Sequence, residues 1–385
     1  MEFIYLDNNA TTRPDDRVVE AMLPYLREEY ANPSSLHFPA QRVRYAVETA
    51  RHQVASLIGA RDRQIVFTSG GTESNHLAIR GLLAARPEKR RVVTTAVEHD
   101  SVLRLCEQLA GEGYAVTQVG VNREGHLDLD ALEAALTPDT AVLSVMHANN
   151  ETGVIFPIEQ VGRIARRHGV PLHVDAVQTA GKLPIDVREL PVDLLSLAAH
   201  KLHGPKGVGA LYVGPGATLR PLLVGGRQEN GLRAGTENVA GIVGFGVACE
   251  LAARHMADEQ GRVRELRDRL ERGILERVPY ARRLGDPARR LPNTTNIGFA
   301  RLSAEAILLL LSNEGICASS GSACSSGSLE PSHVLTAMGI DPEVTHGAIR
   351  FSLSRFNTVQ EIDHVIDVLP GLLRRLEPLS AAAGR

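Results

Sequence analysis

Short apolar runs alternate with longer amphipathic segments through the first half of the chain. The apolar runs have the length and composition of buried strands, and the segments between them repeat apolar residues at helical spacing. The predicted strands are 64–68, 91–96, 114–119, 140–146, 171–175, 193–198 and 208–213. Helices are predicted over 40–57, 73–85, 101–111, 128–136 and 158–168. This alternation predicts an α/β fold with a mostly parallel, seven-stranded sheet covered by helices on both faces.

A long helical stretch over 239–278, with a predicted break near Gly261, leads out of this sheet. Beyond it, strands are predicted at 294–299, 315–318 and 348–353, and helices at 304–313, 332–338 and 358–374. We therefore predict two domains. The large domain is 16–255, and a smaller α+β domain combines the polar arm 1–15 with 256–385.

Composition narrows the class of protein. The chain has 385 residues, of which 43% are hydrophobic, and its formal net charge of −3 gives no electrostatic case for nucleic acid or an anionic membrane. Apolar runs such as 306–311 are far shorter than the ~20 residues that span a bilayer, and no secretory signal is evident. Four cysteines without C-x-x-C spacing indicate neither a disulfide framework nor a metal site. We expect a cytoplasmic protein that binds neither nucleic acid nor membranes.

Three strand ends carry residues that suit one cofactor. Lys201 follows a buried strand and precedes a Gly-Pro turn, which makes it a candidate amine nucleophile, although a lone lysine there is more often a solvated cation. Another strand ends at Asp175, and a third leads into a glycine turn and helix start at Gly71 and Thr72. Pyridoxal phosphate needs an amine, a carboxylate for its pyridine nitrogen and backbone donors for its phosphate. Together these residues predict a pyridoxal phosphate site beyond the strand ends.

The segment 319–333 is rich in serine and glycine and has no helical or strand period, which predicts a mobile loop. A cysteine in such a loop is a poor candidate for core packing, so Cys324 is predicted to be a reactive thiol. Cys106, Cys249 and Cys317 lie in apolar, regular segments and are predicted to be small buried hydrophobes.

This loop and the Lys201 stretch resemble the cysteine desulfurases of the NifS/IscS type, a group of class-V aminotransferases. The resemblance extends from 5–12 to 349–356 and includes 98–99, 146–153 and 233–238. It implies a homodimeric pyridoxal phosphate enzyme with the aspartate-aminotransferase fold, known as fold type I. The implied reaction converts L-cysteine to L-alanine and leaves the sulfur on Cys324 as a persulfide. An acceptor protein, such as an iron–sulfur scaffold, would then take the sulfur.

The resemblance also implies roles around the cofactor ring. Lys201 would bind the cofactor covalently and move protons, and Asp175 would pair with the pyridinium nitrogen. Gln178 would contact the phenolic oxygen, and His99 would stack on the ring and act as acid or base. Without the resemblance, His99 would be explained as a hydrogen-bonded histidine at a strand end.

Further implied roles concern the substrate carboxylate and the cofactor phosphate. The carboxylate would be held by Asn150 and Arg350, and a planar guanidinium is well suited to this contact. Asn150 would also contact the cofactor. A structural salt bridge is the alternative explanation for Arg350. The phosphate would be held by Gly71, Thr72 and His200, and by Thr236 of the partner subunit. The family usually has a serine where this chain has Ala198, so one phosphate contact is expected to be missing.

Three alternatives stay open at this point. A selenocysteine lyase would use the same fold and cofactor. An aminotransferase or carbon–carbon lyase would make Cys324 incidental. A scaffold protein that has lost catalysis would belong to a different class, although the intact set of lysine, aspartate, histidine and cysteine argues against it.

Overall fold

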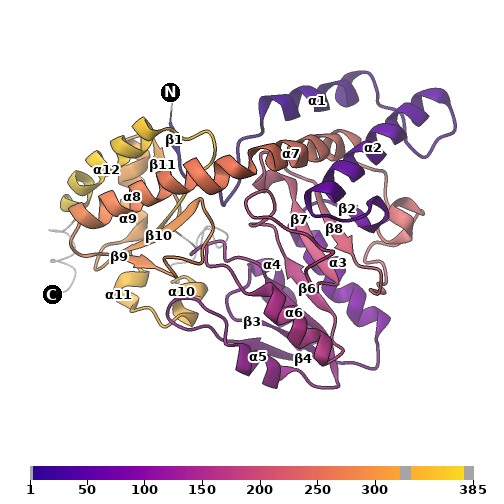
Figure 1. Cartoon of the computed structure of the whole chain (residues 1–385), viewed down its shortest axis with the longest axis horizontal. Coiled ribbons are helices and arrows are strands. Elements are labelled where there is room, and N and C mark those ends of the chain that lie inside the picture. The colour runs from indigo at the N-terminus through magenta and orange to yellow at the C-terminus, as the bar shows by residue number, and fades with distance from the viewer. Residues whose placement is uncertain (1–2, 321–330, 377–385) are drawn as a thin grey trace.

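The computed structural model describes residues 3–320 and 331–376 (Figure 1). Its centre is a seven-stranded sheet in the order β2-β8-β7-β6-β5-β3-β4. The strands are β2 (Ile65–Thr68), β3 (Arg91–Thr95), β4 (Ala115–Val119), β5 (Thr140–Met146), β6 (Leu172–Asp175), β7 (Leu194–Ala198) and β8 (Gly209–Val213). Only β8 runs antiparallel to its neighbours within this sheet. The prediction of a mostly parallel, seven-stranded sheet is therefore confirmed.

Alternating side chains along these strands contact helices on opposite faces of the sheet. On one face, Val66 and Val92 pack with α3 (Gly71–Ala85) and α4 (Asp100–Gly111). On the other face, Phe67 and Val93 belong to a larger core. The helices of that second face are α2 (Phe38–Leu57), α5 (Leu129–Ala135), α6 (Ile158–Arg167) and α7 (Val239–Asp258). Both faces are covered, as the near-continuous apolar runs of the strands predict.

One long helix joins the two halves of the molecule (Figure 1). It consists of α7, a π-helical turn over Glu259–Val263 and α8 (Arg264–Arg277). The predicted break near Gly261 is wrong, because the π turn continues the hydrogen bonding through that position. By length and composition alone the 39 residues could cross a membrane, but 56% of the apolar window is buried inside the protein. The predicted domain boundary near residue 255 falls inside this helix and stays a prediction.

The C-terminal third forms a second core with a three-stranded antiparallel sheet in the order β12-β10-β9. Its strands are β9 (Ala281–Leu284), β10 (Thr294–Phe299) and β12 (Ala348–Ser352). The helices of this core are α8, α9 (Ala304–Asn313) and α12 (Val359–Arg374). The short helices α10 (His333–Ala337) and α11 (Pro342–Thr345) follow in the chain but pack against the larger core. The N-terminal arm joins this part, because β1 (Ile4–Tyr5) pairs with β11 (Ile316–Cys317) and Leu6 is buried in the second core. The arm then runs to α1 (Asp16–Arg27) on the large sheet's side of the molecule.

The cysteines differ in their surroundings. Cys106 and Cys249 are fully buried, and burial raises the pKa of the Cys106 thiol to about 12. Cys317, in the two-residue strand β11, is only partly buried, so the prediction that it is a small buried hydrophobe is wrong. Cys324 and most of the predicted loop, residues 321–330, lie outside the described residues.

His173 provides a pH-dependent test of the fold. It is fully buried in β6, and its two ring nitrogens lie 2.9 Å from the hydroxyls of Ser144 and Ser196. Burial lowers the pKa of this imidazole to about 4, whereas an unfolded histidine takes up a proton near pH ~6.5. Protons therefore favour the unfolded chain below that pH. We expect the wild type to lose up to about 1.4 kcal/mol of unfolding free energy per pH unit from this residue, down to the folded pKa.

Urea denaturation of the wild type and His173→Gln at several pH values measures this contribution. At neutral pH the variant is expected to have a lower free energy of unfolding than the wild type. On acidification this free energy should fall less steeply in the variant. Leu309→Gln, a change at an exposed residue without a titratable side chain, should keep the wild-type slope. Parallel slopes for the wild type and His173→Gln would contradict the prediction.

Candidate active site

A cavity of about 250 Å³ opens where β5, β6 and β7 end. This volume lies just below the usual range of small-molecule sites, which starts at ~300 Å³. Eight of the predicted site residues line it: Gly71, Thr72, His99, Asn150, Asp175, Gln178, His200 and Lys201. Parallel strands deliver their following loops to one edge of a sheet, which brings together residues far apart in sequence.

Lys201 lies in a 3₁₀ turn, Ala199–Lys201, directly after β7. Its ammonium donates to the backbone carbonyl of Ala10 at 2.8 Å and to that of Asn9. These carbonyls belong to the N-terminal arm, so the arm forms one wall of the cavity. Next to the lysine, burial is the main cause that lowers the pKa of His200 to about 3, and the Lys201 charge adds to it. His200 is therefore neutral at neutral pH and can serve as a hydrogen-bonding group.

Asp175 ends β6 and is almost fully buried. One carboxylate oxygen accepts from the side-chain amide of Asn75 at 2.8 Å, and the other accepts from the backbone N–H of Val177 at 3.0 Å. Asn75 also donates to Ser101 at 2.9 Å, and Ser101 contacts His99. The sequence analysis missed Asn75 and Ser101, although both line the cavity.

The phosphate end of the predicted site is the start of α3. Gly70 caps this helix without a side-chain hydrogen bond, so the first-turn amides remain for another acceptor. A Cβ on Gly71 would lie 2.8 Å from a methyl group of Val177, which explains why this close approach needs glycine. Ala198, where the family usually has serine, also lines the cavity and leaves a methyl group there.

Arg350 does not line the cavity, but it contacts a residue that does. In β12 its guanidinium donates to the backbone carbonyl of Asn150 at 3.1 Å and to the carboxylate of Asp7 at 2.7 Å. The salt bridge that was the alternative explanation for Arg350 is thus present. Within the described residues, the buried Nε of Arg350 and the buried Oε1 of Gln178 have no hydrogen-bond partner. Gln178 lines the cavity, so its Oε1 can accept from a ligand there, whereas Arg350 reaches the site through its contact with Asn150.

The two remaining predicted residues lie elsewhere. Thr236 is exposed and does not line this cavity, which is compatible with a contact to another subunit. Cys324 lies outside the described residues. The chain on either side of that gap is attached close to the cavity: Ser319 pairs with the backbone of Arg350, and His333 donates to the carbonyl of Glu98 at 2.9 Å.

The residues present fit pyridoxal phosphate. The cavity offers one amine, one buried carboxylate, an imidazole and a helix N-terminus, and the unsatisfied Oε1 of Gln178 indicates a polar partner still to be supplied. Across residues 3–320 and 331–376, no group of three or more His, Cys, Asp or Glu side chains is arranged to hold a metal ion.

The family model for class-V aminotransferases matches residues 4–365, so the chain belongs to this family. Within it, the chain is 55% identical over 380 residues to a protein of Trichormus azollae named cysteine desulfurase, covering 99% of this chain and 95% of that protein. A solved structure named NifS-like protein superposes with a TM-score of 0.92 at 39% identity, covering 97% of this chain and 100% of that one.

Another solved structure, SspA in complex with cysteine, has a TM-score of 0.82 at 36% identity and covers 92% of this chain and 100% of that one. The predicted resemblance to NifS-type cysteine desulfurases and the fold type I architecture are thereby confirmed.

Proposed function

We propose that this protein is a pyridoxal phosphate-dependent cysteine desulfurase that converts L-cysteine to L-alanine and passes the sulfur to Cys324. The observation that carries the proposal is the cavity in which Lys201, Asp175, Gln178 and His99 meet. It is supported by the 55% identity to a cysteine desulfurase and by the similarity to SspA, whose structure contains cysteine.

The cofactor, when bound, supplies an electron-withdrawing ring that acidifies the substrate's Cα. Lys201 would hold it through the side-chain amine and, once released by the substrate, would take the proton from Cα. Asp175 would pair with the ring nitrogen, Gln178 with the phenolic oxygen, and His99 would cover the ring face. The N-terminal amides of α3 with Thr72 would bind the phosphate.

The sulfur transfer balances without a further reactant. Cys324 acts as a thiolate and forms a bond to the substrate sulfur, while the bond between that sulfur and Cβ breaks and Cβ gains a proton. L-Cysteine and the thiol become L-alanine and a persulfide. A sulfur acceptor such as an iron–sulfur scaffold would then remove the outer sulfur. We place this reaction in the cytoplasm, where reducing conditions keep the thiol available.

A visible spectrum of the purified protein tests the proposal. We expect a band near ~400–420 nm from the bound cofactor, a spectral change on adding L-cysteine, and formation of alanine with sulfide. Protein without the band after incubation with pyridoxal phosphate would contradict it. Much faster turnover of L-selenocysteine would favour a selenocysteine lyase, and transamination of a keto acid would favour an aminotransferase.

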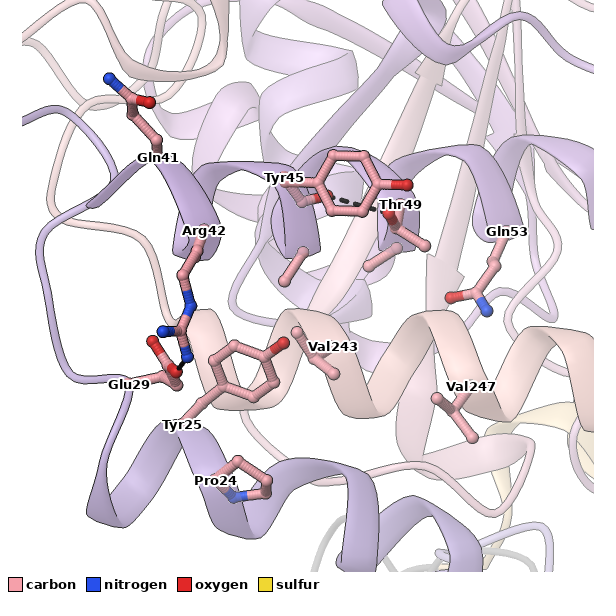
Figure 2. Close-up of a pocket in the computed structure, with 12 residues that line it drawn as sticks. Pro24, Tyr25, Glu29, Gln41, Arg42, Tyr45, Thr49, Gln53, Val243 and Val247 are labelled. Atoms are coloured by element: carbon pink, nitrogen blue, oxygen red, sulfur yellow. Dashed lines mark hydrogen bonds and ion pairs between the residues drawn. The ribbon is translucent and has the colours of Figure 1, made fainter. Parts of the chain in front are cut away.

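We further propose that the protein is a homodimer in which Thr236 reaches the partner's phosphate site. Leu36, in the connection between α1 and α2, and Phe38, the first residue of α2, are 85% and 70% exposed. A groove of about 660 Å³ lies between these helices and α7. Figure 2 shows the side chains that line it, including Tyr45 of α2 and Val243 of α7. Large exposed apolar side chains favour a protein contact over solvent. Analytical ultracentrifugation tests the subunit number, and a stable monomer would contradict the proposal.

Arg350→Lys tests the proposed carboxylate contact. Lysine keeps the positive charge but loses the planar pair of donors, so we expect KM for L-cysteine to rise by roughly 10- to 100-fold, with a smaller change in kcat. Steady-state alanine formation measures both constants. Arg290→Lys is a matched control, because Arg290 is equally buried and paired with Glu271 away from the cavity. Equal KM values for both variants and the wild type would leave Arg350 with only its salt bridge.

A further inference from the structure

Two buried polar side chains connect Asp175 to His99. The side-chain nitrogen of Asn75 lies 2.8 Å from Oδ2 of Asp175 and 2.9 Å from Oγ of Ser101. That hydroxyl in turn lies 2.9 Å from Nδ1 of His99. Asn75 is 1% exposed and Ser101 is 8% exposed, so water does not compete freely for these contacts. The four groups therefore form one continuous hydrogen-bonded chain.

The donor and the acceptor of each of these hydrogen bonds can be assigned, starting from the carboxylate. The carboxylate of Asp175 can only accept, so the NH₂ group of Asn75 faces it and uses its second hydrogen for Ser101. The serine hydroxyl accepts from Asn75 and has its own proton left for His99. The backbone N–H of Ser101 also donates to the same Nδ1, at 3.1 Å. Two donors on Nδ1 require a lone pair there, which leaves the proton of a neutral ring on Nε2.

The surroundings of His99 favour the neutral ring. His99 is the N-cap of α4, and the positive end of a helix dipole disfavours a cation. Burial is the main cause that lowers the pKa of His99. Lys201 and His333 act in the same direction, and Asp175 and Asp100 oppose them.

We propose that Asn75 and Ser101 are positioning residues that hold His99 as the neutral tautomer with its proton on Nε2. His99 then presents an N–H donor on the ring edge away from Ser101 and enters the reaction as a neutral hydrogen-bond donor. The same amide of Asn75 orients Asp175, so one residue orients both the carboxylate and, through Ser101, the imidazole. This inference deepens the proposed function, in which no role is assigned to Asn75 or Ser101.

Nitrogen-15 NMR of histidine-labelled, full-length protein tests the tautomer directly, both before and after loading with pyridoxal phosphate. His99→Gln assigns the signal. We expect a neutral His99 with its proton on Nε2 at neutral pH. Ser101→Ala removes one donor to Nδ1, so the neutral ring loses part of its stabilisation. The midpoint of the His99 titration should therefore rise by about one pH unit. Ser101→Thr keeps the hydroxyl and should restore the wild-type titration.

Ser144→Ala is the matched control, since it alters another buried serine–histidine pair, that of His173, and should leave His99 unchanged. The acid limb of the pH profile of kcat/KM should follow the NMR shift in Ser101→Ala. A wild-type His99 that carries its proton on Nδ1, or is charged at neutral pH, would overturn the inference, as would an unchanged His99 titration in Ser101→Ala. The NMR result does not depend on turnover. The tautomer inference can therefore be wrong in an active cysteine desulfurase, and it can be right in a protein without that activity.

Discussion

Lys201→Ala is expected to lower kcat for alanine formation from L-cysteine by roughly 10⁴-fold or more, because one side chain would both bind the cofactor and move the substrate proton. The variant should also lose the covalent link to pyridoxal phosphate. Borohydride reduction followed by peptide mass spectrometry measures that link, and an alanine assay measures the rate. Lys201 lines the cavity and is partly exposed. Because alanine at this position creates no buried charge, the variant is expected to fold.

Lys206→Ala is the matched control. Lys206 lies five residues further on, is exposed and does not line the cavity. The Lys206→Ala variant should keep the wild-type rate of alanine formation and the covalent link between Lys201 and pyridoxal phosphate. A reduced cofactor adduct found on Lys206, or full activity in Lys201→Ala, would show that the proposed lysine is the wrong one.

Cys324→Ala is expected to lower the rate of alanine formation by about 10³-fold or more, since the substrate sulfur loses its acceptor. Cofactor binding should be unchanged, because the other proposed contacts remain. Mass spectrometry of the wild type after one turnover should find one additional sulfur atom on the peptide that contains Cys324.

Cys317→Ala is the control for this experiment, because Cys317 is the partly exposed thiol within the described residues and precedes Cys324 by seven positions. It should retain activity and persulfide formation. If Cys324→Ala turned over L-cysteine at the wild-type rate without added thiol, the sulfur would have to leave by another route.

The fold was predictable wherever burial alone determines the pattern. The strands of the large sheet other than the edge strand β4 are largely buried, and each predicted strand is present with its ends displaced by at most one residue. β9 was missed because its four residues include two exposed arginines, so it has no apolar run. β1 was missed because two residues become a strand only when β11 arrives from the far end of the chain.

The site was predictable in part for a similar reason. Lys201 and Asp175 follow strands, and their positions are visible in the sequence. Asn75 is a polar residue inside a helix, and its function depends on Asp175, 100 residues later, and on Ser101, 26 residues later. No local pattern distinguishes such a residue from a solvated one, so only the packing of α3 beside β6 identifies it.

The attachment of the N-terminal arm has a consequence for synthesis on the ribosome. The side-chain amide of Asn8 donates to the carbonyl of Ser352, which lies 344 residues later. The large sheet can pair its strands while translation continues, but Asn8 finds this partner only when the last strand has emerged. Because the carbonyls that receive Lys201 belong to the same arm, a nascent chain has Lys201 in place long before this wall of the cavity is fully anchored.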